Sequence, residues 1–173
     1  MTGQINVNKI AARTGNTITV NSGDKISGAA GSIVAPGQII QLIQVQTNTV
    51  FSTTSSSYVD SGFAASITPK FSSSKIYVLA GLNLYNGATN GVSSSTIYRG
   101  SSRISDSATY GHSYGYSNSG AHVNQVTYTY LDSPNTTSAT EYKIYISCVA
   151  NGGTLIMCAN NSSSTLTLME IGQ

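Results

Sequence analysis

The stretch from Val126 to Ser147, VTYTYLDSPNTTSATEYKIYIS, places the strongest constraint on what this chain can fold into. Aromatic and aliphatic residues alternate with threonines before residue 132, and Tyr142, Ile144 and Ile146 restore the alternation after residue 139. This period of two is typical of half-buried strands. A polar loop with one proline separates the two runs, so we expect an antiparallel hairpin with one dry and one wet face. The sequence therefore predicts an all-β fold.

Other segments of the chain repeat this pattern. The segment Lys75 to Tyr85 places five aliphatic residues on one face and predicts a core strand. The segment Gly37 to Val50 is apolar on both faces, which predicts a strand that is buried on both sides. A final strand is expected from Thr165 to Ile171. About eight or nine strands at roughly ten-residue spacing favour a β-sandwich or jelly roll.

The composition narrows the possible partners. Charged residues make up 8% of the 173 residues, whereas roughly a quarter is usual for soluble proteins. The net charge of +2 comes without a basic cluster, so we do not expect nucleic acid as a partner. No apolar run approaches the roughly 20 residues of a membrane span, and the N-terminus has no signal-peptide core. We expect a soluble protein without membrane insertion.

Residues 1–36 differ from the rest of the chain, and we assign domain boundaries of 1–36 for an N-terminal arm and 37–173 for the main domain. Apolar residues in the arm are thinly spread among Gly, Asn and Ser, which predicts short strands that need an outside partner. The positions expected to dock are Ile5, Val7, Ile18 and Val20. A disordered tail is the alternative interpretation. Fully extended, the arm would reach on the order of 100 Å.

The segment from Tyr110 to His122, YGHSYGYSNSGAH, is the candidate ligand or receptor loop. Tyrosines between small polar residues provide rigid contact area with adaptable hydrogen bonding, as in many binding loops. The residues of interest are Tyr110, His112, Tyr114, Tyr116 and His122. The alternative is that these rings pack on their own domain.

No constellation for catalysis, a metal or a cofactor is evident in the sequence. Cys148 and Cys158 flank an Asn-Gly-Gly turn and are interpreted as free buried thiols, although a disulfide stays open. His112 and His122 lack the further ligands that a zinc site requires. There is no GxSxG motif, and the acidic residues are scattered singly. We expect a protein that is not an enzyme and has no cofactor.

A resemblance to a known class lies in four ordered motifs: SSYVDSGFAASITPKFSSSKIYVLAGLNL, IYRG, YLDSPNTTSATEYKIYI and TLTLMEIG. Together they resemble the C-terminal module of many bacteriophage tail-fibre and virion surface proteins, over roughly Gln38 to Gln173. The resemblance implies a jelly roll similar to tumour necrosis factor and to complement globular heads. It also implies a trimer that is exposed on the virion.

The sequence also favours a homotrimer on its own pattern. Strands with two apolar faces fill the sandwich with one face and need a partner for the other. A cyclic trimer supplies that partner. The candidate interface residues are one or the other of two pairs in the last strand: Leu166 and Leu168, or Met169 and Ile171.

Three classes of function follow from this reading. The first is a capsid-decorating or cement protein, in which trimeric knobs on the virion surface dock to other virion proteins through the arm. The second is a receptor-binding tail-fibre tip for host attachment, which contacts host-surface glycans. The third is a polysaccharide depolymerase, for which the sequence offers no acid and base. Capsid and tail locations stay open at this stage.

Overall fold

The computed structural model describes residues 20–28, 33, 35–104, 110–149 and 153–173. The chain divides into two compact units, residues 1–33 and residues 34–173, which we describe separately. Ile5, Val7 and Ile18 lie outside the described residues. Val20 is described and is 41% exposed. Beside it is a short turn in which the Asp24 amide donates to the Asn21 carbonyl at 3.1 Å.

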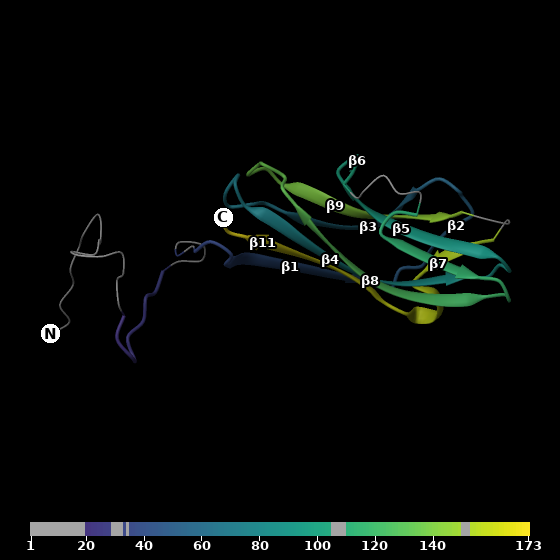
Figure 1. Cartoon of the computed structure of the whole chain (residues 1–173), viewed down its shortest axis with the longest axis horizontal. Helices are drawn as coiled ribbons and strands as arrows, with labels where there is room; N and C mark the ends of the chain where they lie inside the picture. The colour runs from purple at the N-terminus through teal and green to yellow at the C-terminus, as the bar shows by residue number, and fades with distance from the viewer. Residues whose placement is uncertain (1–19, 29–32, 34, 105–109, 150–152) are drawn as a thin grey trace. The chain divides into compact units, whose positions relative to one another are not determined.

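The second unit is all-β and consists of two antiparallel sheets that pack face to face (Figure 1). In the first sheet β4 pairs with β11 and β10 along one edge and with β8 along the other, and β1 and β2 lie beyond β11 and β10. The strands of the first sheet are β1 (Ile39–Thr47), β2 (Phe51–Thr53), β4 (Lys75–Asn86), β8 (His122–Asp132), β10 (Leu155–Met157) and β11 (Ser164–Ile171).

The second sheet has the order β3, β9, β5, with β6 and β7 both paired to the free edge of β5. Its strands are β3 (Val59–Ile67), β5 (Gly91–Arg99), β6 (Ser102–Arg103), β7 (Ser113–Ser117) and β9 (Thr140–Cys148). The short 3₁₀ turn η1 (Ala159–Asn161) joins β10 to β11. Within the described residues no helix has the length and apolar character to cross a membrane.

Strand β4 has the core face that its sequence predicts. Its inward side chains are at most 2% exposed, and they are Ile76, Val78, Ala80, Leu82 and Leu84. From the opposite sheet, Tyr142, Ile144 and Ile146 of β9 are fully buried against them. The period of two therefore identified correctly which residues of these strands fill the sandwich.

The predicted hairpin between Val126 and Ser147 is wrong. Strand β8 pairs with β4 in the first sheet, whereas β9 pairs with β3 and β5 in the second sheet. The polar loop between them passes from one sheet to the other. Alternation in a sequence predicts which face of a strand is buried. It does not predict which neighbouring strand forms the hydrogen bonds.

The prediction that Gly37 to Val50 is buried on both faces is also wrong for the single chain. Strand β1 is an edge strand, paired with β11 alone among the described strands. Ile43 and Val45 pack against the core. Leu42, on the outer face, is 53% exposed, and Ile39 at the start of the strand is 52% exposed. Strand β1 therefore exposes apolar side chains although it lies at the edge of the sheet.

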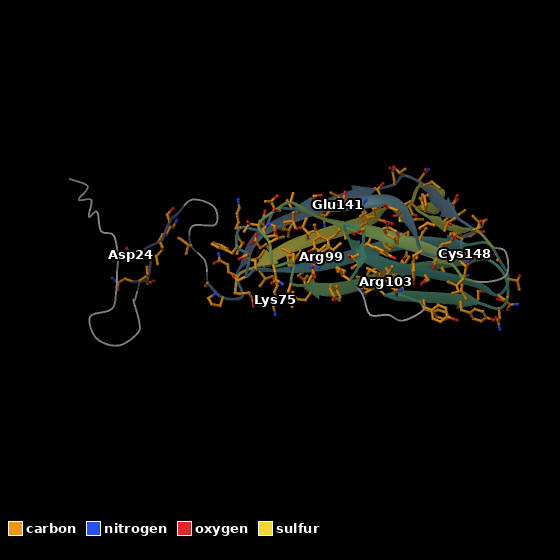
Figure 2. All side chains as sticks on the ribbon, turned by 90° about the horizontal axis from the view of Figure 1, so that it is seen from above. Asp24, Lys75, Arg99, Arg103, Glu141 and Cys148 are labelled. Carbon is orange, nitrogen blue, oxygen red and sulfur yellow. The ribbon has the colours of Figure 1, made fainter. Side chains whose placement is uncertain are left out.

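The domain has two distinct ends. At one end, which we call the base, the chain enters beside its own C-terminus: the Gly37 amide donates to the Gly172 carbonyl at 2.8 Å. We call the opposite end, where β4 reaches Asn86, the far end. Figure 2 shows Lys75 near the base and Cys148 toward the far end.

Candidate functional site

Six tyrosines gather on the outer face of the second sheet. Alternation places Tyr58, Tyr98 and Tyr145 on this face, where they are half-buried. The edge strand β7 and the residues before it add three exposed rings, those of Tyr110, Tyr114 and Tyr116, at 40%, 52% and 51% exposure. We call these six residues the tyrosine surface.

Several rings of the tyrosine surface are held by specific contacts. Tyr98 and Tyr145 stack with ring centroids 3.8 Å apart, and Tyr110 meets Tyr114 edge-on at 4.5 Å. The Tyr116 hydroxyl donates to Asn90 Oδ1 at 2.9 Å. These contacts restrict ring rotation in advance, so a ligand that binds here loses less conformational entropy.

Charges near the tyrosine surface are compensated within the chain. The guanidinium of Arg103 lies 4.8 Å from the ring centre of Tyr58, at cation–π distance. Lys143 Nζ lies 3.2 Å from carboxylate oxygens of both Glu141 and Asp60. Hydrogen bonds to Glu141 and then to Asp60 raise the pKa of Lys143 above its ordinary value.

Gly111 fixes the entry into this surface. Its φ of +63° is in the left-handed region, and a Cβ here would lie 2.6 Å from the Ser95 carbonyl oxygen and from the Tyr58 hydroxyl. Only glycine satisfies both conditions. The next amide, that of His112, donates to the Ser95 carbonyl at 2.9 Å, which ties the segment to β5.

The two histidines predicted for this site do not join the exposed tyrosines. His112 stacks on Tyr128 of β8, with ring centroids 4.9 Å apart, and thereby bridges the edges of the two sheets. His122 lies at the start of β8, with Nε2 3.3 Å from Ser93 Oγ. The structure thus brings Tyr110, Tyr114 and Tyr116 together and places the histidines between the sheets.

Sequence reasoning missed half of the tyrosine surface. Tyr58, Tyr98 and Tyr145 come from three separate segments, and each occupies an outward position of an alternating strand or lies just before one. The outward position of each tyrosine in its strand pattern was the sequence signal that could have assigned it to this surface. Without knowledge of which strands are neighbours, it did not connect these residues to the segment Tyr110 to His122.

A row of four apolar side chains crosses the outer face of the first sheet near the base. Strand register places Leu42, Met169, Tyr77 and Leu131 directly opposite one another on β1, β11, β4 and β8. Leu42 and Leu131 are 53% and 49% exposed, and the other two residues are half-buried. Directly opposed side chains on one face are in contact range. We call these four residues the apolar row.

The two residue pairs proposed for a trimer interface lie on opposite faces of β11. Leu166 and Leu168 are fully buried in the sandwich core, so they are not available to another subunit. Met169 and Ile171 lie on the outer face and are half-buried. Met169 belongs to the apolar row.

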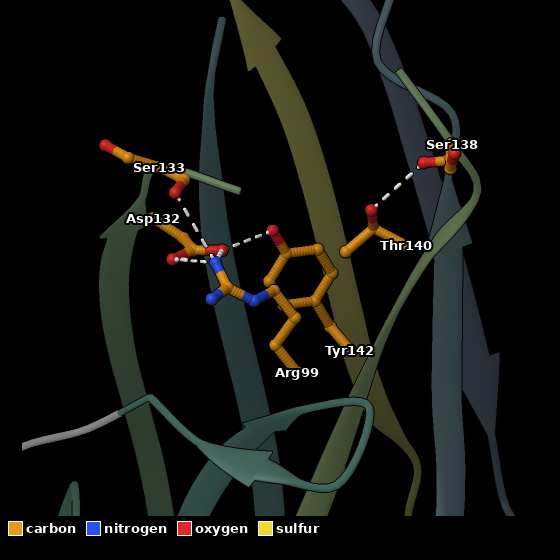
Figure 3. A network of polar contacts seen from close by, with 6 residues as sticks. All are labelled: Arg99, Asp132, Ser133, Ser138, Thr140 and Tyr142. Atoms are coloured by element: carbon orange, nitrogen blue, oxygen red, sulfur yellow. Dashed lines mark hydrogen bonds and ion pairs between the residues drawn. The ribbon is translucent and has the colours of Figure 1, made fainter. Parts of the chain in front are cut away.

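A partly buried ionic network ties the two sheets together (Figure 3). Asp132 of β8 accepts hydrogen bonds from Arg99 of β5 at 2.8 and 2.9 Å, and from the hydroxyl of Tyr142 of β9 at 2.7 Å. Burial, followed by the bond to Asp132, raises the pKa of Tyr142 far above its ordinary value. Arg99 therefore binds a carboxylate of its own chain.

The described residues offer little for metal or thiol chemistry. Among them, no group of three or more His, Cys, Asp and Glu residues is placed to hold a metal ion. Cys148 and Cys158 are free and buried. The Cys148 thiol lies 3.3 Å from the Gly153 carbonyl, and the Cys158 thiol lies 3.3 Å from Ser164 Oγ. Both thiols behave as small core residues.

The architecture defines a two-sheet β-sandwich. No family model matches the chain, and no curated protein is similar to it in sequence. Among solved structures, the chain is similar to the VP2 subviral particle of infectious bursal disease virus, with a TM-score of 0.42 and 14% identity. That alignment covers 87% of this chain and 42% of the VP2 chain. The T=1 particle derived from the same virus gives a TM-score of 0.38 and 14% identity, over 87% of this chain and 41% of that chain.

Proposed function

We propose that this chain is a non-enzymatic structural protein of a bacteriophage virion. In this proposal the sandwich is a jelly-roll knob of a homotrimer on the capsid surface, and residues 1–36 dock the knob to other virion proteins. The resemblance of four ordered sequence motifs to virion surface proteins supports the virion assignment. The apolar row is the single structural observation that carries the proposal.

The apolar row supports a subunit interface for a physical reason. Four apolar side chains in contact range across four strands form a continuous patch, and soluble monomers rarely leave such patches uncovered. A neighbouring subunit covers the patch in a closed cyclic assembly. The row lies near the base, the end at which Gly37 enters the domain. In this proposal the subunit interface and the start of the attachment arm are both at the base of the domain. The far end of the domain is then exposed.

The second candidate function is a tail-fibre tip that contacts host-surface glycans. The tyrosine surface favours it, because exposed rings beside hydroxyl and amide groups bind both the C–H faces and the hydroxyls of sugars. Copy number separates the two candidates. A cement protein is present in many copies over the shell, whereas a tail tip is present in few copies at one vertex.

The arm is tested by deletion of residues 1–36. We expect the truncated chain to fold and to form the same oligomer as the full chain, but not to be incorporated into particles. Incorporation is measured by the ratio of this protein to the major shell protein in purified particles. Normal incorporation of the truncated chain contradicts a docking role for the arm, and so does failure of the truncated chain to fold.

A further inference from the structure

A small cavity opens at the far end of the first sheet, and it belongs to neither surface described above. Its volume is about 210 Å³. Its floor consists of two directly paired positions of β4 and β8, Tyr85 with Val123 and Asn83 with Gln125. Asn160 of η1 lines one side. Two strands and a turn from distant parts of the sequence thus converge on one hollow.

The turn that forms this side has an unusual backbone. Cys158, Asn160 and Asn161 have φ values of 58°, 55° and 59°, all in the left-handed region. A residue other than glycine persists in this conformation only where its surroundings hold it in place. The Cys158 amide donates to the Asn83 carbonyl at 2.9 Å, which fastens the turn to β4. The Asn160 side of the cavity is therefore fixed before any ligand arrives.

The lining selects an uncharged ligand. It combines the aromatic ring of Tyr85, the aliphatic Val123 and the amides of Asn83, Gln125 and Asn160, and no charged side chain is among the described residues that line it. An ionic group placed here would gain no counter-charge from these residues. A small molecule with an apolar C–H face and several hydroxyl groups matches all of these features.

We propose that this cavity binds one neutral pyranose residue of a glycan. Its C–H face lies against Tyr85, and its hydroxyl groups bond with the amides of Gln125 and Asn160. This inference deepens the second proposed function, the glycan-binding tip, because it assigns a ligand class to a site apart from the tyrosine surface. The cavity residues Asn83 and Tyr85 lie six and eight positions along β4 from Tyr77, about 20 and 27 Å at strand rise. A trimer that is joined through the apolar row therefore leaves the cavity open.

Ligand-observed saturation-transfer NMR on the full-length chain tests the proposal, with glucose, galactose and N-acetylglucosamine as separate probes. We expect at least one of them to bind. Gln125→Ala and Asn160→Gly should each weaken that binding about tenfold, the effect of losing one hydrogen bond of about 1.4 kcal/mol. Glycine keeps the left-handed turn at residue 160, so this variant removes the amide without unfolding the side of the cavity.

Gln46→Ala, at an exposed glutamine of β1 that does not line the cavity, is the matched control and should bind the sugar unchanged. The proposal is overturned if none of the three sugars binds, or if both cavity variants bind as well as the natural chain. If Tyr114→Ser alone abolishes binding, the sugar occupies the tyrosine surface. In that case the tip function stands and the cavity assignment fails. Particle incorporation tests the cement function independently of every one of these outcomes.

Discussion

At the scale of single residues, the charged side chain of Asp132 connects the two sheets of a domain that has few charges. Its carboxylate comes from the first sheet and both of its partners, Arg99 and Tyr142, come from the second. Loss of a hydrogen bond to a charged group costs about 1.5 to 3 kcal/mol. We predict that Tyr142→Phe lowers the free energy of unfolding by this amount in urea titrations. Tyr114→Phe, at an exposed ring, should change it by less than about 0.5 kcal/mol. Equal effects of the two variants would contradict a role for this network.

Buried phenols give the domain a defined sensitivity to alkali. Burial raises the pKa values of Tyr128 and Tyr142 far above the ordinary value of about 10. Above pH 10 the unfolded chain releases these protons while the folded chain retains them, so stability falls as the pH rises. Each such tyrosine contributes a slope of about 1.4 kcal/mol per pH unit. We predict that Tyr142→Phe removes one such contribution from the pH dependence of unfolding above pH 10. Parallel curves for variant and natural chain would refute the assignment.

At the scale of elements, Gly111 controls how β7 presents its tyrosines. Gly111→Ala combines a positive φ with contacts of 2.6 Å to neighbouring oxygens, whereas Gly100→Ala shares a positive φ, of 57°, and meets nothing within 4 Å. We predict that both variants destabilise the domain by about 1 kcal/mol or more, and that Gly111→Ala costs more. Only Gly111→Ala should change the near-ultraviolet circular dichroism of the tyrosines. An unchanged spectrum would show that β7 tolerates the displacement.

The elements also show what the sequence predicts and what it leaves open. Alternation assigned the inward faces of β4 and β9 correctly, because burial of every second side chain is a local property. For β11 it separated the two faces but left open which of them is buried. It did not reveal that β8 and β9 lie in different sheets, since partner choice depends on segments far away in the chain. The tyrosine surface was half predicted for the same reason. Tyr110, Tyr114 and Tyr116 are close in sequence, whereas the other three rings meet them only after folding.

At the scale of the whole molecule, a strand with two apolar faces is expected to be covered on both, but its sequence does not predict whether the same chain or another subunit provides the cover. Strand β1 was expected to be buried on both sides, and in the single chain its outer face is open. The proposed trimer reconciles the pattern with the fold, because a second subunit supplies the missing cover. A proposed contact through the apolar row lies near the base, so this trimer would leave the tyrosine surface and the small cavity free.

The mass of the 173-residue chain in solution, measured by light scattering at micromolar concentration, tests the proposed trimer most directly. We predict three chain masses for the natural chain and one chain mass for the double variant Leu42→Thr, Leu131→Thr, with folding retained because both side chains are about half exposed. Val123→Thr, an exposed position on the same face at the far end, should leave the mass at three chains. A natural chain that is monomeric, or a double variant that stays trimeric, would contradict the claim that the apolar row joins the subunits.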